Sequence, residues 1–187
     1  MKKDDRRVRK TKKAIQEALA ELMMEKGLQN ITIQELADKA DIHRATFYTH
    51  YEDVYDLYSQ MEQSAIDEIN AIITSGAYKY EEAFKVIIDY VYDNAKMCRL
   101  FLDKKISGGF YDKISEFIEG KCLEYLDETL KEGVDEKWRY LVVYHMQGCL
   151  AIISRWVIRG FDLSKEDITK ILVQVDTYFD EYLFSKF

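Results

Sequence analysis

The chain has 187 residues, of which 48% are hydrophobic, and it carries a formal net charge of −7 at pH 7. This length suits one compact domain or a small domain on a larger one, and the lack of eighteen consecutive apolar residues argues against a membrane span. Because the N-terminus is charged and has no apolar signal-peptide core, we expect a cytoplasmic protein.

Charge is distributed unevenly along the chain. Residues 1–51 hold eleven Lys or Arg and eight Asp or Glu, whereas the remaining residues hold sixteen and twenty-six. The first thirteen residues alone hold eight basic and two acidic side chains. A basic arm on an acidic body indicates a local anionic partner such as nucleic acid, although charge alone is equally consistent with a solvated, disordered tail.

The pattern predicts an all-α fold, because the chain has no proline, only eight glycines, and apolar residues that recur at three and four. The first helix is predicted from about Lys10 to Lys26, with Ile15, Leu19 and Leu22 on its apolar face. Gly27 follows the helix and suits the left-handed position that often ends helices.

A second, short helix is predicted in "TIQELADKA", Thr32 to Ala40. Thr32 is a good N-cap, and Glu35 three residues later completes a capping box. Leu36 and Ala37 lie on its apolar face. Because two turns of helix are not stable alone, this helix must dock on a neighbour.

A third helix is predicted from about Arg44 to His50, within the segment "DIHRATFYTHY". Asp41 precedes it and tolerates the left-handed conformation that a tight break needs. The side chains expected to face the core are Ile42, Phe47 and Tyr51. Two short helices joined by a tight turn behind a longer helix predict a helix-turn-helix.

A long fourth helix is predicted from Val54 to about Ser75, with Asp53 as its cap and Gly76 after its end. It should link the small N-terminal unit to the rest of the chain. Further helices are expected at about Glu81–Asp103, with a break near Cys98, and at Phe110–Lys131, Asp135–Arg159 and Lys165–Ser185.

Two segments of the sequence resemble a known family. The segment "AIQEALAELMMEKGLQNITIQELADKADIHRATFYTHYEDVYDLY" is similar to the DNA-binding region of TetR-type transcriptional regulators, and "GCLAIISRWVIRGFDLSKEDI" resembles the C-terminal end of a subgroup often found in Firmicutes. The resemblance implies a three-helix helix-turn-helix DNA-binding domain, with the basic arm, over residues 1–52. It also implies a larger helical domain over residues 53–187 that binds a small effector and dimerises.

Two positions depart from the family pattern. The family usually has Gly where this chain has Asp41, a change that the left-handed tolerance of Asp accommodates. It usually has a Lys that donates to a phosphate just inside the fourth helix, where this chain has Val54. One phosphate contact is therefore expected to be missing, and the basic arm is a candidate to compensate for it.

The third helix is expected to enter the major groove of DNA by its N-terminal residues. That geometry brings His43, Arg44 and Ala45 nearest the bases. Arg44 can donate two hydrogen bonds to guanine, and Ala45 is small enough to touch a thymine methyl group. Thr46 is within reach of a base or a phosphate. The alternative for His43 is that it simply caps its own helix.

The remaining polar side chains of this segment are expected to follow the phosphate backbone. A phenol, a hydroxyl and an imidazole, on Tyr48, Thr49 and His50, suit phosphate oxygens, and the resemblance implies phosphate contacts for Tyr48 and His50. The start of the second helix, Thr32 and Ile33, presents N–H groups to another phosphate. The alternatives are that Tyr48 packs on its own domain and that His50 is an ordinary surface residue.

The C-terminal two-thirds of the chain is rich in aromatic residues. Plain core packing is the favoured interpretation, and a cavity with phenol groups for an unknown small-molecule effector is the alternative. The chain is expected to form a homodimer through its last two helices. The two DNA-binding domains would then lie roughly 34–36 Å apart on the duplex. The stripes that would pair are Leu141, Tyr144, Gly148 and Ile152 on one helix and Ile171, Val175, Tyr178 and Tyr182 on the last.

Nothing in the sequence predicts a metal, a cofactor or an active site. Cys98, Cys122 and Cys149 lack disulfide or zinc spacing and are interpreted as buried thiols. His145 and Cys149 lie four apart, but no further ligand pair supports a metal, so helix packing is favoured. We find no nucleophile with a base and no Gly-rich phosphate loop, so an enzyme is not expected.

The sequence therefore predicts a ligand-responsive, homodimeric repressor that binds a palindromic double-stranded DNA operator through the helix at residues 44–50. The alternative is a co-regulator of the same fold that acts mainly through protein contacts with another regulator. The acidic body and the Val54 departure leave that alternative open.

Overall fold

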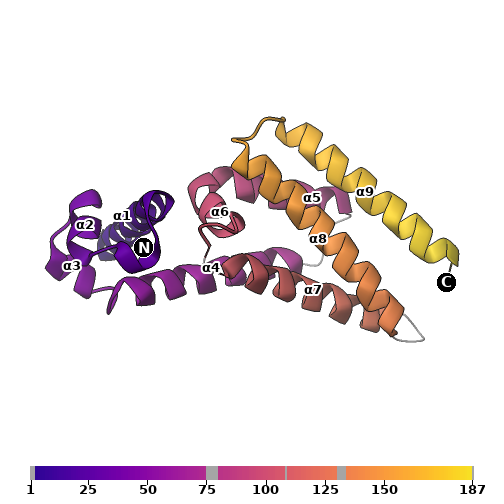
Figure 1. Ribbon diagram of the computed structural model, residues 1–187, viewed down its shortest axis with the longest axis horizontal. Coiled ribbons are helices and arrows are strands. Elements are labelled where there is room, and N and C mark those ends of the chain that lie inside the picture. Colours follow the sequence, from indigo (N-terminus) through magenta and orange to yellow (C-terminus); the bar gives the residue numbers. More distant parts are fainter. Residues whose placement is uncertain (1–2, 75–79, 108, 130–133, 187) are drawn as a thin grey trace.

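The computed structural model describes residues 3–74, 80–107, 109–129 and 134–186 (Figure 1). These residues form helices and turns without a strand, so the predicted all-α class is confirmed. Two predicted helix ends, at Ser75–Gly76 and at Lys131, lie outside the described part of the chain. The side chain of Tyr182 also lies outside it. The helices are α1 (Lys3–Glu25), α2 (Ile33–Lys39), α3 (Arg44–Tyr48), α4 (Val54–Thr74), α5 (Tyr80–Asp93), α6 (Ala95–Leu102), α7 (Phe110–Thr129), α8 (Glu136–Ile158) and α9 (Lys165–Lys186).

The first helix is longer than predicted, because α1 begins at Lys3 instead of Lys10. No Gly or Pro interrupts residues 1–26, and Lys and Arg are good helix formers, so the helix continues through the basic arm. The Lys13 ammonium also lies 3.8 Å from the Glu17 carboxylate one turn later. The disordered-tail alternative is therefore wrong for residues 3–13.

The chain leaves α1 without the predicted left-handed glycine. Gly27 has φ −64° and ψ 153°, an extended conformation, and it precedes a 3-10 turn at Leu28–Asn30. That turn requires the Gly27 carbonyl to accept the Asn30 N–H at 2.9 Å. The prediction for Gly27 is wrong because the turn follows directly and needs no reversal of backbone hand.

We call α1, α2 and α3 the head and α5 to α9 the body. In the head, the predicted capping box is present: the Thr32 hydroxyl accepts the Glu35 N–H at 3.2 Å, and the Glu35 carboxylate accepts the Thr32 N–H at 3.0 Å. Asp41 has φ 54°, as the tight break required. Phe47 is fully buried and Tyr51 nearly so, which fixes α3 against the other two helices.

The long helix α4 joins the head to the body (Figure 1). Its N-terminus is capped as predicted, since the Asp53 carboxylate accepts the Asp56 N–H at 2.8 Å. One apolar cluster contains Leu19 of α1, Met61 of α4 and Phe101 of α6. The core is therefore continuous from the head into the body.

The predicted break near Cys98 lies instead at Asn94, between α5 and α6. Asn94 has φ −110° and ψ 32°, and its side-chain amide donates to the Tyr90 carbonyl at 2.9 Å. An asparagine that bonds its own preceding turn competes with helix continuation, which explains the position of the break. Cys98 is buried within α6.

By length and composition, α8 could also cross a membrane, with a mean hydropathy of 1.4 over its most apolar window. Its most apolar side chains are instead used inside the body, where Val142 and Trp156 are nearly fully buried. The Trp156 indole N–H donates to the Leu163 carbonyl at 2.9 Å. Gly160 and Phe161, both at positive φ, turn the chain so that α9 packs back on α8 (Figure 1). We interpret α8 as the core helix of the body.

A buried polar pair lies between α8 and α9. The His145 Nε2 and Asp176 Oδ1 atoms are 2.7 Å apart, and the imidazole stacks on Phe179 at 4.2 Å. Burial lowers the pKa of His145, but hydrogen bonds to Asp176 and Cys149 raise it, to about 9. The described residues contain no group of three ligands suited to a metal. His145 and Cys149 are both buried, and His145 joins α8 to α9 through Asp176.

The cysteines differ in burial. Cys98 and Cys149 are buried free thiols, and burial, aided by the Glu68 charge, raises the pKa of Cys98 to about 12. Cys122 is only half-buried, so the prediction of a buried thiol is wrong there. The α7 face that carries it lies at the margin of a small apolar cluster with Trp138 of α8.

Candidate nucleic-acid interface

The helix α3 has one buried and one exposed side. Phe47 anchors it in the core, with the half-buried Ile42 beside the anchor. His43, Arg44 and Ala45, at the start of the helix, are all exposed. Because these residues occupy the first turn, the end of the helix that can enter a groove presents two long donors and one methyl group.

His43 does not use its side chain to cap α3. It occupies the N-cap position with an extended backbone, φ −76° and ψ 145°, and its imidazole makes no capping hydrogen bond. The capping is done by backbone, because the His43 carbonyl accepts the Thr46 N–H at 2.8 Å. The imidazole is therefore left facing solvent at the exposed end of the helix.

Two predicted DNA contacts touch each other in the free protein. The Arg44 guanidinium donates to the Tyr48 phenol oxygen at 3.3 Å. Tyr48 is 51% exposed, and its ring meets Phe47 edge-on at 5.8 Å. Tyr48 thus packs on its domain through the ring while its hydroxyl remains accessible. This contact was not among the predictions, although a spacing of four residues on a helix is the signal that indicates it.

The other polar side chains of α3 and its C-terminal turn are less free. The Thr49 hydroxyl donates to the Thr46 carbonyl at 2.7 Å, so its proton is already used. Thr46 itself is half-buried. His50 is half-buried, and the centres of its ring and the Tyr51 ring lie 6.3 Å apart. The positions differ in exposure, with Tyr48 and Thr49 more open than Thr46 and His50.

The start of α2 offers fewer N–H groups than predicted. The Thr32 N–H and hydroxyl both bond to Glu35, so only Ile33 of the predicted pair keeps its N–H for another acceptor. A hydrogen bond from Lys26 and two from Thr32 lower the pKa of Glu35 to about 2. A carboxylate therefore already occupies the positive end of this helix, and Lys26 at 2.6 Å offsets its charge.

The start of α4 carries no cationic donor. Val54, at the position where the resembled family has a Lys, is 5% exposed and belongs to the core. Its neighbours Asp53 and Asp56 accept backbone N–H groups of this turn. The predicted loss of one phosphate contact at this position is consistent with that arrangement.

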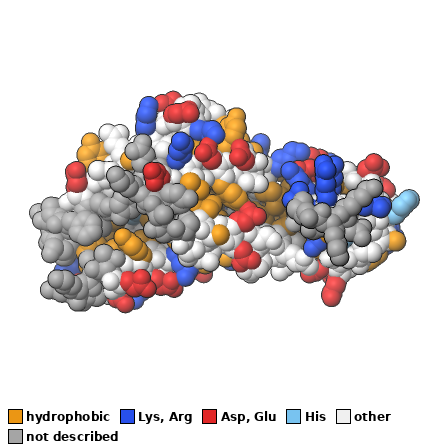
Figure 2. Space-filling model, turned by 180° about the vertical axis from the view of Figure 1, so that it is seen from behind, with side chains coloured by type: hydrophobic (Ala, Val, Ile, Leu, Met, Phe, Trp, Pro, Cys, Tyr) orange, Lys and Arg blue, Asp and Glu red, His pale blue; other side chains and the backbone are white. Residues whose placement is uncertain are grey.

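Basic side chains gather on the head instead. Arg6, Arg7, Arg9 and Lys10 are exposed on the first turns of α1, and Figure 2 shows Lys and Arg side chains concentrated at this end of the molecule. The Lys12 ammonium lies 5.7 Å from the centre of the Tyr51 ring. The arm is therefore attached to the same three-helix unit that carries α3.

Comparison with known proteins gives matches along most of the chain. Residues 15–61 match the family profile described as bacterial regulatory proteins, tetR family. Residues 79–176, more than half of the chain, match the profile described as transcriptional regulator C-terminal region. These matches cover the helix-turn-helix and most of the body.

Individual proteins are more distant. The uncharacterized HTH-type transcriptional regulator YxbF of Bacillus subtilis (strain 168) is 34% identical over 91 residues, which are 46% of this chain but only 24% of that protein. The biofilm operon icaADBC negative transcriptional regulator IcaR of Staphylococcus aureus (strain Newman) is 20% identical over 67% of this chain and 75% of its own. The crystal structure of a TetR transcriptional regulator from Streptococcus agalactiae 2603V shares the fold, with a TM-score of 0.57 at 24% identity over 92% of this chain and 97% of that one.

Proposed function

Because the chain belongs to the TetR family of bacterial transcriptional regulators, we propose that it is a homodimeric, ligand-responsive repressor that binds a palindromic operator through the helix at residues 44–50. Members of this family are DNA-binding transcription factors and not enzymes. The proposal assigns DNA binding to residues 1–52, effector binding and dimerisation to residues 53–187, and a cytoplasmic location. The observation that carries it is the set of exposed side chains at the start of α3, His43, Arg44 and Ala45, on a helix that the buried Phe47 anchors.

In the proposed complex, the first turn of α3 reads bases. Arg44 donates to guanine, while His43 and Ala45 flank it at the groove floor. Thr46 is half-buried, so we assign it a supporting contact at the groove edge.

The phosphate contacts are proposed on both sides of the groove. Tyr48, Thr49 and His50 would accompany one strand, and the N–H of Ile33 at the start of α2 the other. Arg7 and Lys10 of the arm are proposed to replace the cation that Val54 does not provide. These contacts would add affinity for any sequence and a dependence on salt.

Exposed apolar side chains on α8 and α9 support dimerisation through these helices. Tyr144 is 75% exposed and Tyr178 63% exposed, on the two predicted stripes. Gly148, one turn after Tyr144 on α8, is exposed, and outside its chain neighbours and its own helix backbone no atom of the chain lies within 4 Å of the position a Cβ would take. Aromatic anchors beside a site of close backbone approach suit a two-fold helix pairing.

The second candidate function is a co-regulator that acts mainly through protein contacts with another regulator, and one observation favours it. The head has Val54 in place of a cation, and the Glu35 carboxylate occupies the start of α2. Both features would reduce its affinity for DNA phosphates. In that case the exposed tyrosines of the body would bind another regulator instead of a second copy.

Selection of genomic DNA fragments by the full-length protein, repeated at several salt concentrations, tests the proposal. A palindromic motif whose binding falls steeply with salt supports the operator-binding repressor. Weak binding without sequence preference contradicts it and favours the co-regulator. Expression of the neighbouring gene with and without the protein then separates repression from activation.

A further inference from the structure

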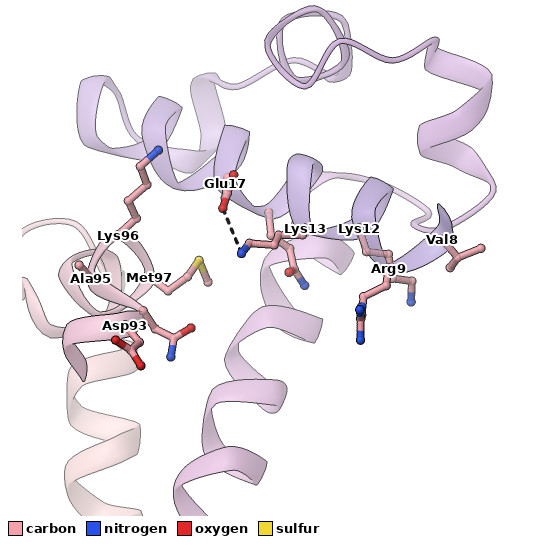
Figure 3. A pocket seen from close by; sticks show the side chains of 11 residues that line it. Val8, Arg9, Lys12, Lys13, Glu17, Asp93, Ala95, Lys96 and Met97 are labelled. Atoms are coloured by element: carbon pink, nitrogen blue, oxygen red, sulfur yellow. Dashed lines mark ion pairs between the residues drawn. The ribbon is translucent and has the colours of Figure 1, made fainter. Parts of the chain in front are cut away.

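A hollow of about 650 Å³ lies between the first half of α1 and the junction of α5 with α6 (Figure 3). Arg9, Lys12 and Lys13 line it from α1, and Lys96 and Met97 line it from the start of α6. Figure 3 shows that side chains from both helices border the same space. The hollow therefore lies between the head and the body, and not inside either.

The hollow is cationic. Its described lining contains four Lys or Arg and two carboxylates, Glu17 and Asp93. Glu17 lies 3.8 Å from Lys13, and Asp93 acts with the stronger partner Asp89 to raise the pKa of Lys165 on α9. Both carboxylates therefore already have a cation nearby.

Two of the lining cations are not neutralised in this way. Arg9 and Lys12 are within ion-pair distance of no described carboxylate. Within the described part of the chain, the Lys12 ammonium lies over the Tyr51 ring, 5.7 Å from the ring centre. An anion in the hollow would therefore meet two cations that no carboxylate among the described residues already pairs with.

The α6 side adds a polar and an apolar feature. The N-cap Asn94 makes no side-chain capping bond to α6, because its amide donates backwards to Tyr90. The positive end of an eight-residue helix thus borders the hollow without a capping side chain. Val8, Ala95 and Met97 supply apolar surface beside the cations. This combination fits a molecule with an anionic group and a short apolar portion.

We propose that this hollow binds an amphiphilic organic anion, a small carboxylate or phosphate ester with an apolar chain, and that its binding weakens the hold on DNA. Lys96 carries the coupling, because it pairs with Glu21 of α1 at 2.7 Å, and Glu21 pairs with Lys39 of α2 at 3.3 Å. An anion that binds Lys96 competes with Glu21 for it and so weakens the ion pair that joins α6 of the body to α1 of the head. Exposed ion pairs are individually weak, so the coupling lies near the low end of the allosteric range, about tenfold or less.

Calorimetric titration of the full chain with octyl phosphate, without DNA, tests the site. Octyl phosphate is expected to bind and 1-octanol not, because the cations recognise the charge. The double variant Arg9→Gln/Lys12→Gln should weaken binding roughly tenfold, the equivalent of one charge-assisted contact or more. The matched control Arg7→Gln/Lys10→Gln removes the same charge from the same helix outside the hollow and should bind octyl phosphate as the parent does. Absence of binding by the parent, equal binding of octanol, or equal loss in the control overturns the site.

The regulatory part rests on the proposed DNA-binding function and is measured separately. Octyl phosphate should weaken binding to a selected DNA fragment about tenfold, and Lys96→Gln should abolish that response. An unchanged DNA affinity with the hollow occupied overturns the coupling. If the chain binds no DNA, the calorimetric result still decides the site, so failure of the function and failure of the site are distinguishable.

Discussion

The head and the body have opposite surfaces. In the head, Phe47 is buried and the donors of α3 are exposed, whereas in the body polar groups bond to one another inside. The Ser154 hydroxyl of α8 donates to the Leu102 carbonyl of α6 at 2.9 Å, and His145 pairs with Asp176. Tyr144 and Tyr178 are meanwhile left outside. Exposed donors suit phosphate and exposed aromatic rings suit a protein partner, so an acidic chain can bind DNA by keeping the two kinds of surface apart.

The largest expected effect comes from the residue that anchors the head. Phe47→Ala should lower the free energy of unfolding by about 3–5 kcal/mol, because it leaves a cavity in a fully packed site. Urea unfolding followed by far-UV circular dichroism and by the fluorescence of Trp138 and Trp156 measures it. Both tryptophans lie in the body, so a continuous core predicts that the two signals shift together.

The exposed Tyr55→Ala serves as the control for Phe47→Ala and should change stability by less than about 0.5 kcal/mol. A fluorescence transition that stays unchanged while the dichroism signal falls early would show that the head unfolds alone. That outcome would contradict the continuity of the core between head and body.

The next effect concerns the outer surface of the body. Tyr144→Lys should lower dimer stability by about 2–4 kcal/mol. In the proposed dimer the Tyr144 ring is buried between the two copies, and the substitution places a charge there on both of them. Light scattering at micromolar concentration is expected to give a dimer for the parent and a monomer for the variant. Tyr55→Lys, on the exposed side of α4, should leave the dimer intact. A parent protein that is already monomeric would remove the basis for paired reading heads.

A smaller effect is expected at the outer surface of the head. Arg44→Ala should cost about 1–3 kcal/mol of specific DNA binding and relax preference at one operator position. Competition binding with operator variants measures both. Arg99→Ala removes an exposed arginine from α6 and should change neither. Unchanged operator affinity in Arg44→Ala would mean that the proposed register of α3 is wrong.

The smallest effect is the pH dependence of the body. Because the pKa of His145 is raised to about 9 in the folded chain, the stabilisation it provides is complete below the unfolded value near 6.5 and is lost as pH rises through 9. The change should be on the order of 1 kcal/mol. Urea unfolding at pH 6 and pH 9.5 measures it, and His145→Gln should remove this pH dependence. A stability that rises over the same range in the parent would contradict the assignment.

Local signals in the sequence predicted much of the head. The Thr32–Glu35 capping box, the left-handed Asp41 and the buried Phe47 each depend on residues within a few positions of one another, and the structure confirms all three. The start of α1 differs from the prediction because Lys and Arg form helix readily even where, as in the arm, no apolar stripe marks one.

The body was less predictable because its contacts join residues far apart. Nothing local indicates that His145 meets Asp176, thirty-one positions later. The sequence does not divide the aromatic residues into core and surface. A helical stripe has the same sequence pattern whether it packs inside its own chain or against a second copy of the chain. Phe110 is buried and Tyr144 exposed, and only the packing of neighbouring helices decides between them.

The contact between Arg44 and Tyr48 has a consequence for how DNA preference can change over evolution. An arginine already held by its neighbour loses less rotational freedom when it meets a base. If the proposed contacts are made, loss of the Tyr48 hydroxyl would therefore reduce discrimination between bases as well as weaken a phosphate contact. The two positions are expected to be inherited as a pair, so a lineage that acquires a new operator must change both codons or pass through an intermediate that reads DNA less strictly.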